Sequence, residues 1–204
     1  MVLRRDGLKR HDELLDAALR SFAKHGLMKT GIEHVRREAG ASPSSVYHHF
    51  AGLPGLTEAL LTRTFERLFT ELAAKVVRAS SAERAVRALV QAHVSWVLAH
   101  PDEARFMYQA TALELDPAAG DVFQARKAEL LAPIVAHLRP FMAARELPRW
   151  SPLVFDLIVL GPTHEACRRY LAGAELDPKW MRVALPRLAW RSLGTASRAA
   201  RRQA

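Results

Sequence analysis

The chain of 204 residues contains a single cysteine, so no disulfide can form within it. No stretch approaches the roughly twenty uncharged apolar residues that a membrane-spanning helix requires. The basic segment at residues 1–10 has no apolar run behind it, which excludes a secretory signal peptide of the usual pattern. We therefore expect a cytoplasmic protein that does not bind a membrane.

The common signatures of catalysis are also missing. The chain has no Gly-x-Ser-x-Gly elbow, no phosphate-binding P-loop and no Gly-x-Gly-x-x-Gly. The segment 164–168 begins like the zinc-protease pattern His-Glu-x-x-His, but Arg168 replaces the second histidine, so the two metal ligands at i and i+4 do not exist. We expect no enzyme, no catalytic residue, no cofactor and no metal site.

Cys167 leaves two alternatives open. It precedes Arg168 and Arg169, whose positive charges would favour the reactive thiolate if the side chain were exposed. In that case Cys167 would be a redox-sensing thiol. Otherwise it is a buried and inert cysteine.

Sustained two-residue alternation and Asn-Gly hairpin turns are absent as well, whereas helical spacing of apolar residues recurs throughout. The sequence predicts an all-α protein of about nine helices. It places a turn at 116–120 and a loop at 147–152, and it treats Pro133 and Pro140 as kinks or breaks. The expected helices cover residues 11–25, 32–39, 43–50, 53–79, 82–99, 102–115, 121–144, 153–172 and 178–193.

The most informative segment is residues 26–50. Ile32, Val35 and Ala39 recur at spacings of three and four, so they share one face of a short helix. Gly40 follows, where a left-handed backbone commonly ends a helix. A second short helix comes directly after this turn.

Ser42 and Pro43 suit the start of that second helix, because a serine oxygen caps free N–H groups and proline fits the first helical position. Val46 and Phe50, four residues apart, give the helix a buried face. Its other faces carry polar side chains that can reach phosphates or base edges, namely Ser44, Ser45, Tyr47 and His48. The pattern indicates a DNA-reading helix-turn-helix; the alternative is an ordinary helical bundle whose polar residues face water.

Residues from about 9 to 60 resemble the DNA-binding domain of the tetracycline-repressor (TetR) family. The resemblance rests on four motifs in the family's order and spacing: Phe22-Ala23-Lys24-His25-Gly26, then Thr30, then Ala39-Gly40-Ala41-Ser42, then Tyr47-His48-His49-Phe50. It implies an N-terminal three-helix domain followed by a larger helical ligand-binding and dimerisation domain. It also implies a homodimer that binds a palindromic operator, usually represses transcription, and releases DNA when a small molecule enters the C-terminal domain.

On this resemblance the expected DNA contacts are Thr30, Ser42, Ser44, Ser45, Tyr47, His48 and His49, and Arg36 is added as a candidate replacement for a phosphate contact of the family. The chain departs from the family pattern at three places. Leu53 stands where a phosphate-contacting lysine is common, Gly31 where Ser or Thr is common, and Arg36 where a small alanine is common. Loss of that lysine would weaken DNA binding and its salt dependence, unless Arg36 or Arg37 replaces the contact.

The net charge of +9 is unevenly distributed, because residues 178–204 hold seven Lys and Arg and no acid. The last ten residues, with Arg198, Arg201 and Arg202, are interpreted as a basic, disordered tail. An arm that adds non-specific DNA affinity is the alternative. The predicted domains are therefore residues 1–52, residues 53–194 and the tail 195–204.

Two features of the larger domain suggest function. The segments 153–160 and 180–190 are apolar on more than one side, as core helices or a dimer interface would be; the resemblance favours a homodimer through the last two long helices. Candidate ligand-lining residues, suited to a mostly apolar molecule with a polar handle, are His93, Trp96, Phe106, Tyr108, Gln109, Phe123, Phe155 and His164. The alternative to a ligand-released repressor is a helical ligand-binding or scaffold protein whose DNA-reading module is weakened or vestigial.

Overall fold

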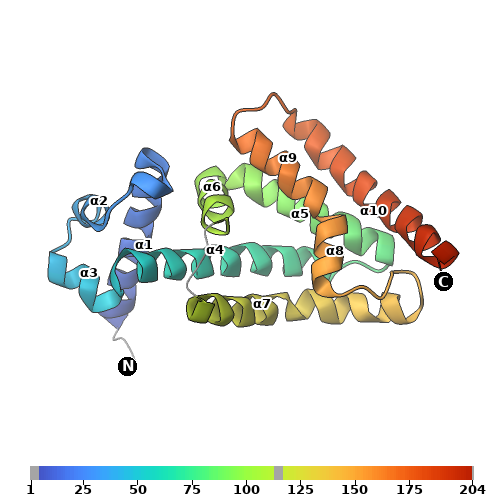
Figure 1. The fold of residues 1–204 in the computed structure, drawn as a ribbon, viewed down its shortest axis with the longest axis horizontal. Coiled ribbons are helices and arrows are strands. Elements are labelled where there is room, and N and C mark those ends of the chain that lie inside the picture. The colour runs from blue at the N-terminus through green and yellow to red at the C-terminus, as the bar shows by residue number, and fades with distance from the viewer. Residues whose placement is uncertain (1–4, 113–116, 204) are drawn as a thin grey trace. The chain divides into compact units, whose positions relative to one another are not determined.

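A computed structural model of the protein describes residues 5–112 and 117–203, with side chains described over 7–112 and 124–194. All regular structure in those ranges is helical, which confirms the predicted fold class (Figure 1). The elements are α1 (Arg5–His25), the short 3-10 helix η1 (Leu27–Lys29), α2 (Ile32–Glu38), α3 (Pro43–His49), α4 (Gly52–Val76), α5 (Ala82–Ala99), α6 (Pro101–Ala110), α7 (Pro117–Ala143), α8 (Pro152–Val159), α9 (Gly161–Leu171) and α10 (Pro178–Gln203).

The chain forms two compact units. The first lies within Met1–Phe65 and Asp102–Lys127, and the second within Glu66–Pro101 and Ala128–Ala204. Helix α4 is continuous from Gly52 to Val76 and contributes residues to both units. The domain boundary at residue 52 therefore stays a prediction of the sequence.

The core of the first unit forms because α1 is apolar along one face. Its residues Leu14, Leu15 and Phe22 are buried, and α2 packs against this helix. Gly26 ends α1 with φ of 83°, a conformation that favours glycine. Val35 of α2 and Val46 of α3 are almost completely buried. The periodicity of the sequence predicted the buried faces at Val35 and Val46.

The turn between α2 and α3 has the predicted chemistry. Gly40 has φ of 55°, in the left-handed region that ends many helices. Ser42 then caps α3, because its Oγ accepts a hydrogen bond from the Ser45 N–H at 3.2 Å. Pro43 follows at the first helical position. The capping serine and the glycine together orient the start of α3.

The second unit is built around α5, which packs against α10 and α9 (Figure 1). Helix α5 begins after Ser81, whose side chain caps it by accepting the Arg84 N–H, and Val90, Val94 and Val97 on it are fully buried. Met181 of α10 is equally buried. Within the described parts of the chain, no helix has the length and apolar character needed to cross a bilayer.

Several predicted elements were wrong in their boundaries. The apolar segment 153–172 is two helices, α8 and α9, because Pro162 has no N–H to donate to the preceding helical turn. Ten α-helices are present in the described ranges, against about nine expected. Helix α6 ends at Ala110, short of the expected residue 115; residues 113–116 lie outside the described ranges.

Two further differences concern α7 and the C-terminal end. Helix α7 begins at Pro117, where a turn was expected, because proline fits a first helical position. It continues through Pro133 and Pro140, with the nearby Ile134 and Leu138 buried, so packing offsets the lost backbone hydrogen bonds. Helix α10 continues to Gln203 in place of the expected disordered tail, since alanine and arginine are good helix formers.

Removing the cap of α3 should destabilise the protein. We expect Ser42→Ala to lower the free energy of unfolding by about 1 kcal/mol, because the Ser45 N–H loses its partner. The matched control is Ser44→Ala, an exposed serine whose hydroxyl contacts only that of Ser42, with an expected change below about 0.5 kcal/mol. Urea denaturation measures both. Equal losses for the two variants would contradict the capping role.

Buried His93 should make stability depend on pH. It is 1% exposed, and burial, helped by His164, lowers the pKa of His93 to about 3, against a smaller opposing effect of Asp156. Between pH ~6.5 and ~3 the unfolded chain therefore binds a proton at this position that the folded chain does not. The free energy of unfolding should fall as the pH is lowered through this window, by up to ~1.4 kcal/mol per pH unit.

The measurement is urea denaturation between pH 4.5 and 7 for the wild type and His93→Gln. In the glutamine variant the free energy of unfolding should depend less steeply on pH, because residue 93 no longer binds a proton in the unfolded chain. This difference should appear whatever the stability of the variant at pH 7. Identical slopes for the two proteins would refute this assignment.

Candidate nucleic-acid interface

Helix α3 presents a row of polar side chains on a rigid support. Val46 on one side is 1% exposed, and Phe50 directly after the helix is 6% exposed. On the opposite side Tyr47 is 62% exposed, and Ser44 and His48 are exposed as well. These three side chains can reach a partner without any rearrangement of the core.

The two other serines of the predicted set have different surroundings. Ser42 is exposed, but its Oγ already accepts the Ser45 N–H and lies 3.0 Å from the Oγ of Ser44. The side chain of Ser45 is half-buried. Ser42 therefore shapes the start of α3, and Ser44 is the serine most open to a partner.

Thr30 is a correction to the predicted contacts. Its side chain is 4% exposed, and its hydroxyl donates to the carbonyl oxygens of Gly26 at 2.8 Å and Ser21 at 3.2 Å. These bonds join the end of α1 to the segment that leads into α2. The structure thus gives the Thr30 hydroxyl a structural role inside the fold in place of a contact with DNA.

The adjacent arginines Arg36 and Arg37 differ in their availability. Arg36 donates to Glu33 Oε2 at 2.8 Å and to the carbonyl oxygen of Ala41 at 3.2 Å, so it fixes the turn after α2. The side chain of Arg37 is exposed, and its guanidinium makes no hydrogen bond or ion pair with the described residues. The cation of this helix that is open to a phosphate is therefore Arg37 and not Arg36.

His49 packs inside a cluster of rings. Its ring meets the edge of His48 at a centroid distance of 5.2 Å and that of His11 at 6.1 Å. Its Nδ1 is buried without a hydrogen-bond partner. Burial, with the nearby charges of His48, His11 and Arg10, lowers the pKa of His49. A neutral, half-buried imidazole suits packing better than binding a phosphate.

Sequence reasoning missed the role of two other histidines. The Nδ1 of His34 accepts the Gly31 N–H at 3.0 Å and so caps the start of α2. The ring of His25, at the end of α1, stacks on that of His34 with centroids 4.6 Å apart. The spacing Gly-x-x-His could have predicted this cap. It places a side-chain acceptor three residues after the N-cap residue, as in a capping box.

The candidate ligand-lining residues are divided between the two units. In the first unit Phe106 is buried and stacks on Phe22 at 5.2 Å, Tyr108 is half-buried and Gln109 is exposed. The side chain of Phe123 lies outside the described residues. The predicted set is therefore not a single cluster within either unit.

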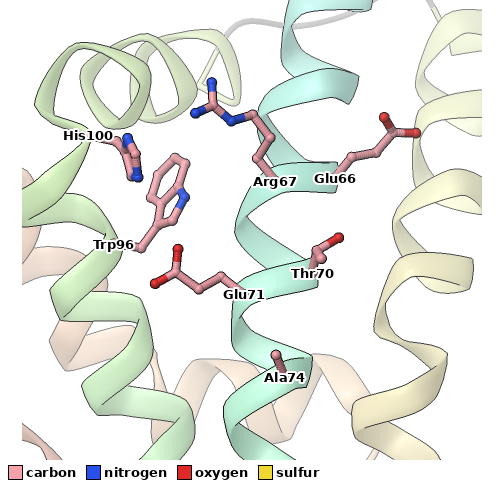
Figure 2. Close-up of a pocket in the computed structure, with 7 residues that line it drawn as sticks. All are labelled: Glu66, Arg67, Thr70, Glu71, Ala74, Trp96 and His100. Atoms are coloured by element: carbon pink, nitrogen blue, oxygen red, sulfur yellow. The ribbon is translucent and has the colours of Figure 1, made fainter.

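The remaining four candidates belong to the second unit. His93 is buried and meets the edge of the His164 ring at 4.7 Å, while His164 Nε2 lies 3.6 Å from Asp156 Oδ1. Phe155 is 7% exposed and therefore belongs to the core. Trp96 lines a groove of about 470 Å³. Trp96 is thus the member of the predicted set that contributes to this groove (Figure 2).

The environment of Cys167 decides between its two alternatives. The side chain is completely buried, and Arg168 and Arg169 both pair with Glu165. These charges therefore do not activate an exposed thiol, and Cys167 is a core residue. Among the described residues, no group of three or more His, Cys, Asp or Glu side chains could hold a metal ion.

Comparison with known proteins identifies the N-terminal part of the chain. Residues 14–60 match the family model described as bacterial regulatory proteins, tetR family. The regulator BetI of Brucella canis is 28% identical over 86 residues, and that of Agrobacterium fabrum is 34% identical over 91 residues. These alignments cover 42% and 43% of this chain, and 43% and 41% of the two relatives. The chain thus matches less than half the length of these curated relatives.

Similar solved structures extend over nearly the whole chain. A TetR family transcription regulator from Marinobacter aquaeolei has a TM-score of 0.74 at 17% identity, covering 94% of this chain and 98% of its own. FadR from Bacillus subtilis, solved in complex with stearoyl-CoA, has a TM-score of 0.73 at 12% identity, covering 89% and 98%. At these identities the likeness establishes the fold alone. Residues 14–60 thus match the tetR family of bacterial regulatory proteins, and the chain shares the fold of solved regulators of that family.

Proposed function

We propose that the protein is a sequence-specific DNA-binding transcriptional regulator, a repressor that leaves a palindromic operator when a small-molecule effector binds. The observation that carries the proposal is α3 itself, a capped helix that holds Ser44, Tyr47 and His48 exposed opposite a buried Val46. A helix-turn-helix places such a helix in the major groove, where hydroxyl groups meet base edges and phosphates. Such a regulator acts in the cytoplasm, where bacterial DNA lies.

Within this proposal, Ser44 lies nearest the bases, and Tyr47 and His48 position the phosphate backbone. Ser45 remains in the set as a half-buried neighbour. Leu53 cannot contact a phosphate, and Arg37 supplies this contact in its place. Arg37 is exposed, whereas the side chain of Arg36 is hydrogen-bonded within the turn. The Arg36 and Ser42 side chains support the geometry of the turn.

The experiment that tests the function is selection of binding sites from random duplex DNA with the purified chain, at two salt concentrations. Enrichment of an inverted repeat is the expected result, since a two-fold dimer reads two half-sites. If no DNA sequence is enriched and binding to all sequences weakens alike as the salt concentration rises, the protein contacts DNA only through charge. That outcome would favour the alternative of a ligand-binding or scaffold protein with a weakened reading module, to which Leu53 points.

Arg37 should contribute one phosphate contact. We expect Arg37→Ala to weaken binding to all DNA sequences alike and to reduce the slope of log affinity against log salt by about 0.9. The control is Arg78→Ala, an exposed arginine beyond the end of α4. Affinity measured by fluorescence anisotropy on the selected operator, at several salt concentrations, checks this. A slope that stays unchanged in Arg37→Ala would exclude the contact.

A homodimer through α8 and α10 completes the proposed function. Both helices leave large apolar side chains on the surface, and an extended apolar patch of this kind marks an interaction site. The side chains are Leu153 (67% exposed), Leu157 (60%), Val183 (52%), Leu188 (50%) and Trp180 (47%). Leu188 also lines a groove of about 380 Å³ with Ile158 and Leu185.

The dimer should depend on this apolar face. Light scattering at micromolar concentration should give about twice the 22.8 kDa of one chain. Leu157→Glu should produce monomers, because a carboxylate cannot be buried unpaired in an apolar interface. Val77→Glu, at a 44% exposed apolar residue outside both helices, should leave the mass unchanged. A wild-type monomer, or a Leu157→Glu dimer, would rule out this interface.

A further inference from the structure

Helix α3 lacks the side chains that identify bases most strongly. Its seven residues, PSSVYHH, include no arginine, lysine, asparagine, glutamine, aspartate or glutamate. Paired hydrogen bonds to guanine and adenine come from arginine, lysine, asparagine and glutamine, and cytosine is read by the two acids. Sequence selection by α3 therefore needs another kind of contact.

The exposed side chains of α3 follow one another around the helix. Successive residues are turned by about 100°, so residues four apart are neighbours on the surface. Going round the helix, the order is Pro43, Tyr47, Ser44 and His48. All four are exposed, whereas Val46 on the other side is buried. Tyr47 and Ser44 therefore occupy the middle of the exposed face.

Hydrogen bonding from the middle of this face is weakly selective. The Ser44 Oγ lies 3.0 Å from the Oγ of Ser42, so part of its hydrogen-bonding capacity is already in use. A hydroxyl group can donate or accept, and it bonds with base edges of either kind. Ser44 can thus add affinity without deciding which base pair lies opposite.

The other half of the exposed face is apolar. The Pro43 ring is exposed, and the Tyr47 side chain is 62% exposed, with its aromatic ring between the backbone and the hydroxyl group. In the major groove the C5-methyl of thymine is the apolar group that distinguishes one base from the others. Contact between this methyl and an apolar side chain removes both from water. The Tyr47 hydroxyl, beyond the ring, remains available to a phosphate.

We propose that α3 recognises thymine by its C5-methyl group, which the Pro43 and Tyr47 side chains contact, so that thymines opposite this helix determine the operator sequence. The inference rests on the proposed function, because it names the base that the reading helix selects. It predicts that removal of a single methyl group from the DNA weakens binding, although every hydrogen-bonding group of the base pair is kept.

The test uses the full chain and the inverted repeat selected from random DNA. Thymines of one half-site are replaced one at a time by uracil, which pairs with adenine in the same way and lacks only the methyl group. Fluorescence anisotropy should show the Kd of the wild type rising about fourfold at one or more positions, as expected for one buried methyl group. Uracil in place of thymines outside the half-sites is the control and should leave the Kd unchanged.

Variants of α3 assign the effect to its side chains. Tyr47→Ala should bind the thymine and uracil operators with the same Kd, and Pro43→Ser should bring the ratio of the two Kd values closer to one. Tyr47→Phe keeps the ring and loses the hydroxyl, so it should keep the wild-type ratio. His48→Ala, at the other edge of the exposed face, is the matched control and should keep it too. Low salt keeps the affinity of weakened variants measurable.

Each ratio compares two duplexes with the same protein, so a loss of folded protein in a variant cancels. Equal Kd values for thymine and uracil at every position of the half-site in the wild type would overturn the proposal. A ratio that is undiminished in Tyr47→Ala, or a selected half-site without thymine, would overturn it as well. These three results leave the regulator standing, because a specific operator is still bound. Failure to select any operator refutes the regulator and the thymine contact together.

Discussion

The two helices that would read DNA are too short to be stable by themselves. Helices α2 and α3 have seven residues each, and an isolated helix needs about 12–15 residues to persist in water. Their geometry therefore depends on side-chain hydrogen bonds at the ends of the helices. His34 supplies one at the start of α2, Ser42 supplies one at the start of α3, and Arg36 closes the turn between them. The exposed row on α3 is positioned by these contacts and by the buried Val35 and Val46.

The second unit follows a different principle. Its central helices α5 and α10 are long, with 18 and 26 residues, and burial of apolar side chains between α5, α9 and α10 holds the unit together. Polar groups in this unit, such as His93, are tolerated in the core only in the neutral form. The unit also leaves large apolar residues of α8 and α10 on its surface, a feature that association would use.

Much of this arrangement was predictable from the sequence, because helical periodicity and helix-ending residues are local signals. The all-α class, the cap Ser42, the turn at Gly40 and the start of α5 after Ser81 followed from them. The division between α8 and α9 at Leu160 did not, since continuous apolar residues conceal a helix end. Thr30 and Arg36 were predicted DNA contacts because of their residue type and place in the motif. Residue type and position do not reveal that a side chain already donates a hydrogen bond to a backbone carbonyl of the protein itself. The groove that Trp96 lines was not predictable from the sequence, because its residues come from separate helices.

The cap on α2 ties the start of this helix to the chemical form of one ring. Because His34 Nδ1 accepts the Gly31 N–H, the neutral imidazole must carry its proton on Nε2. A doubly protonated ring has no lone pair to offer, so the hydrogen bond cannot exist in that form. Protonation would also place a positive charge against the stacked ring of His25. The first turn of α2 is thus held by a bond that a single proton can abolish.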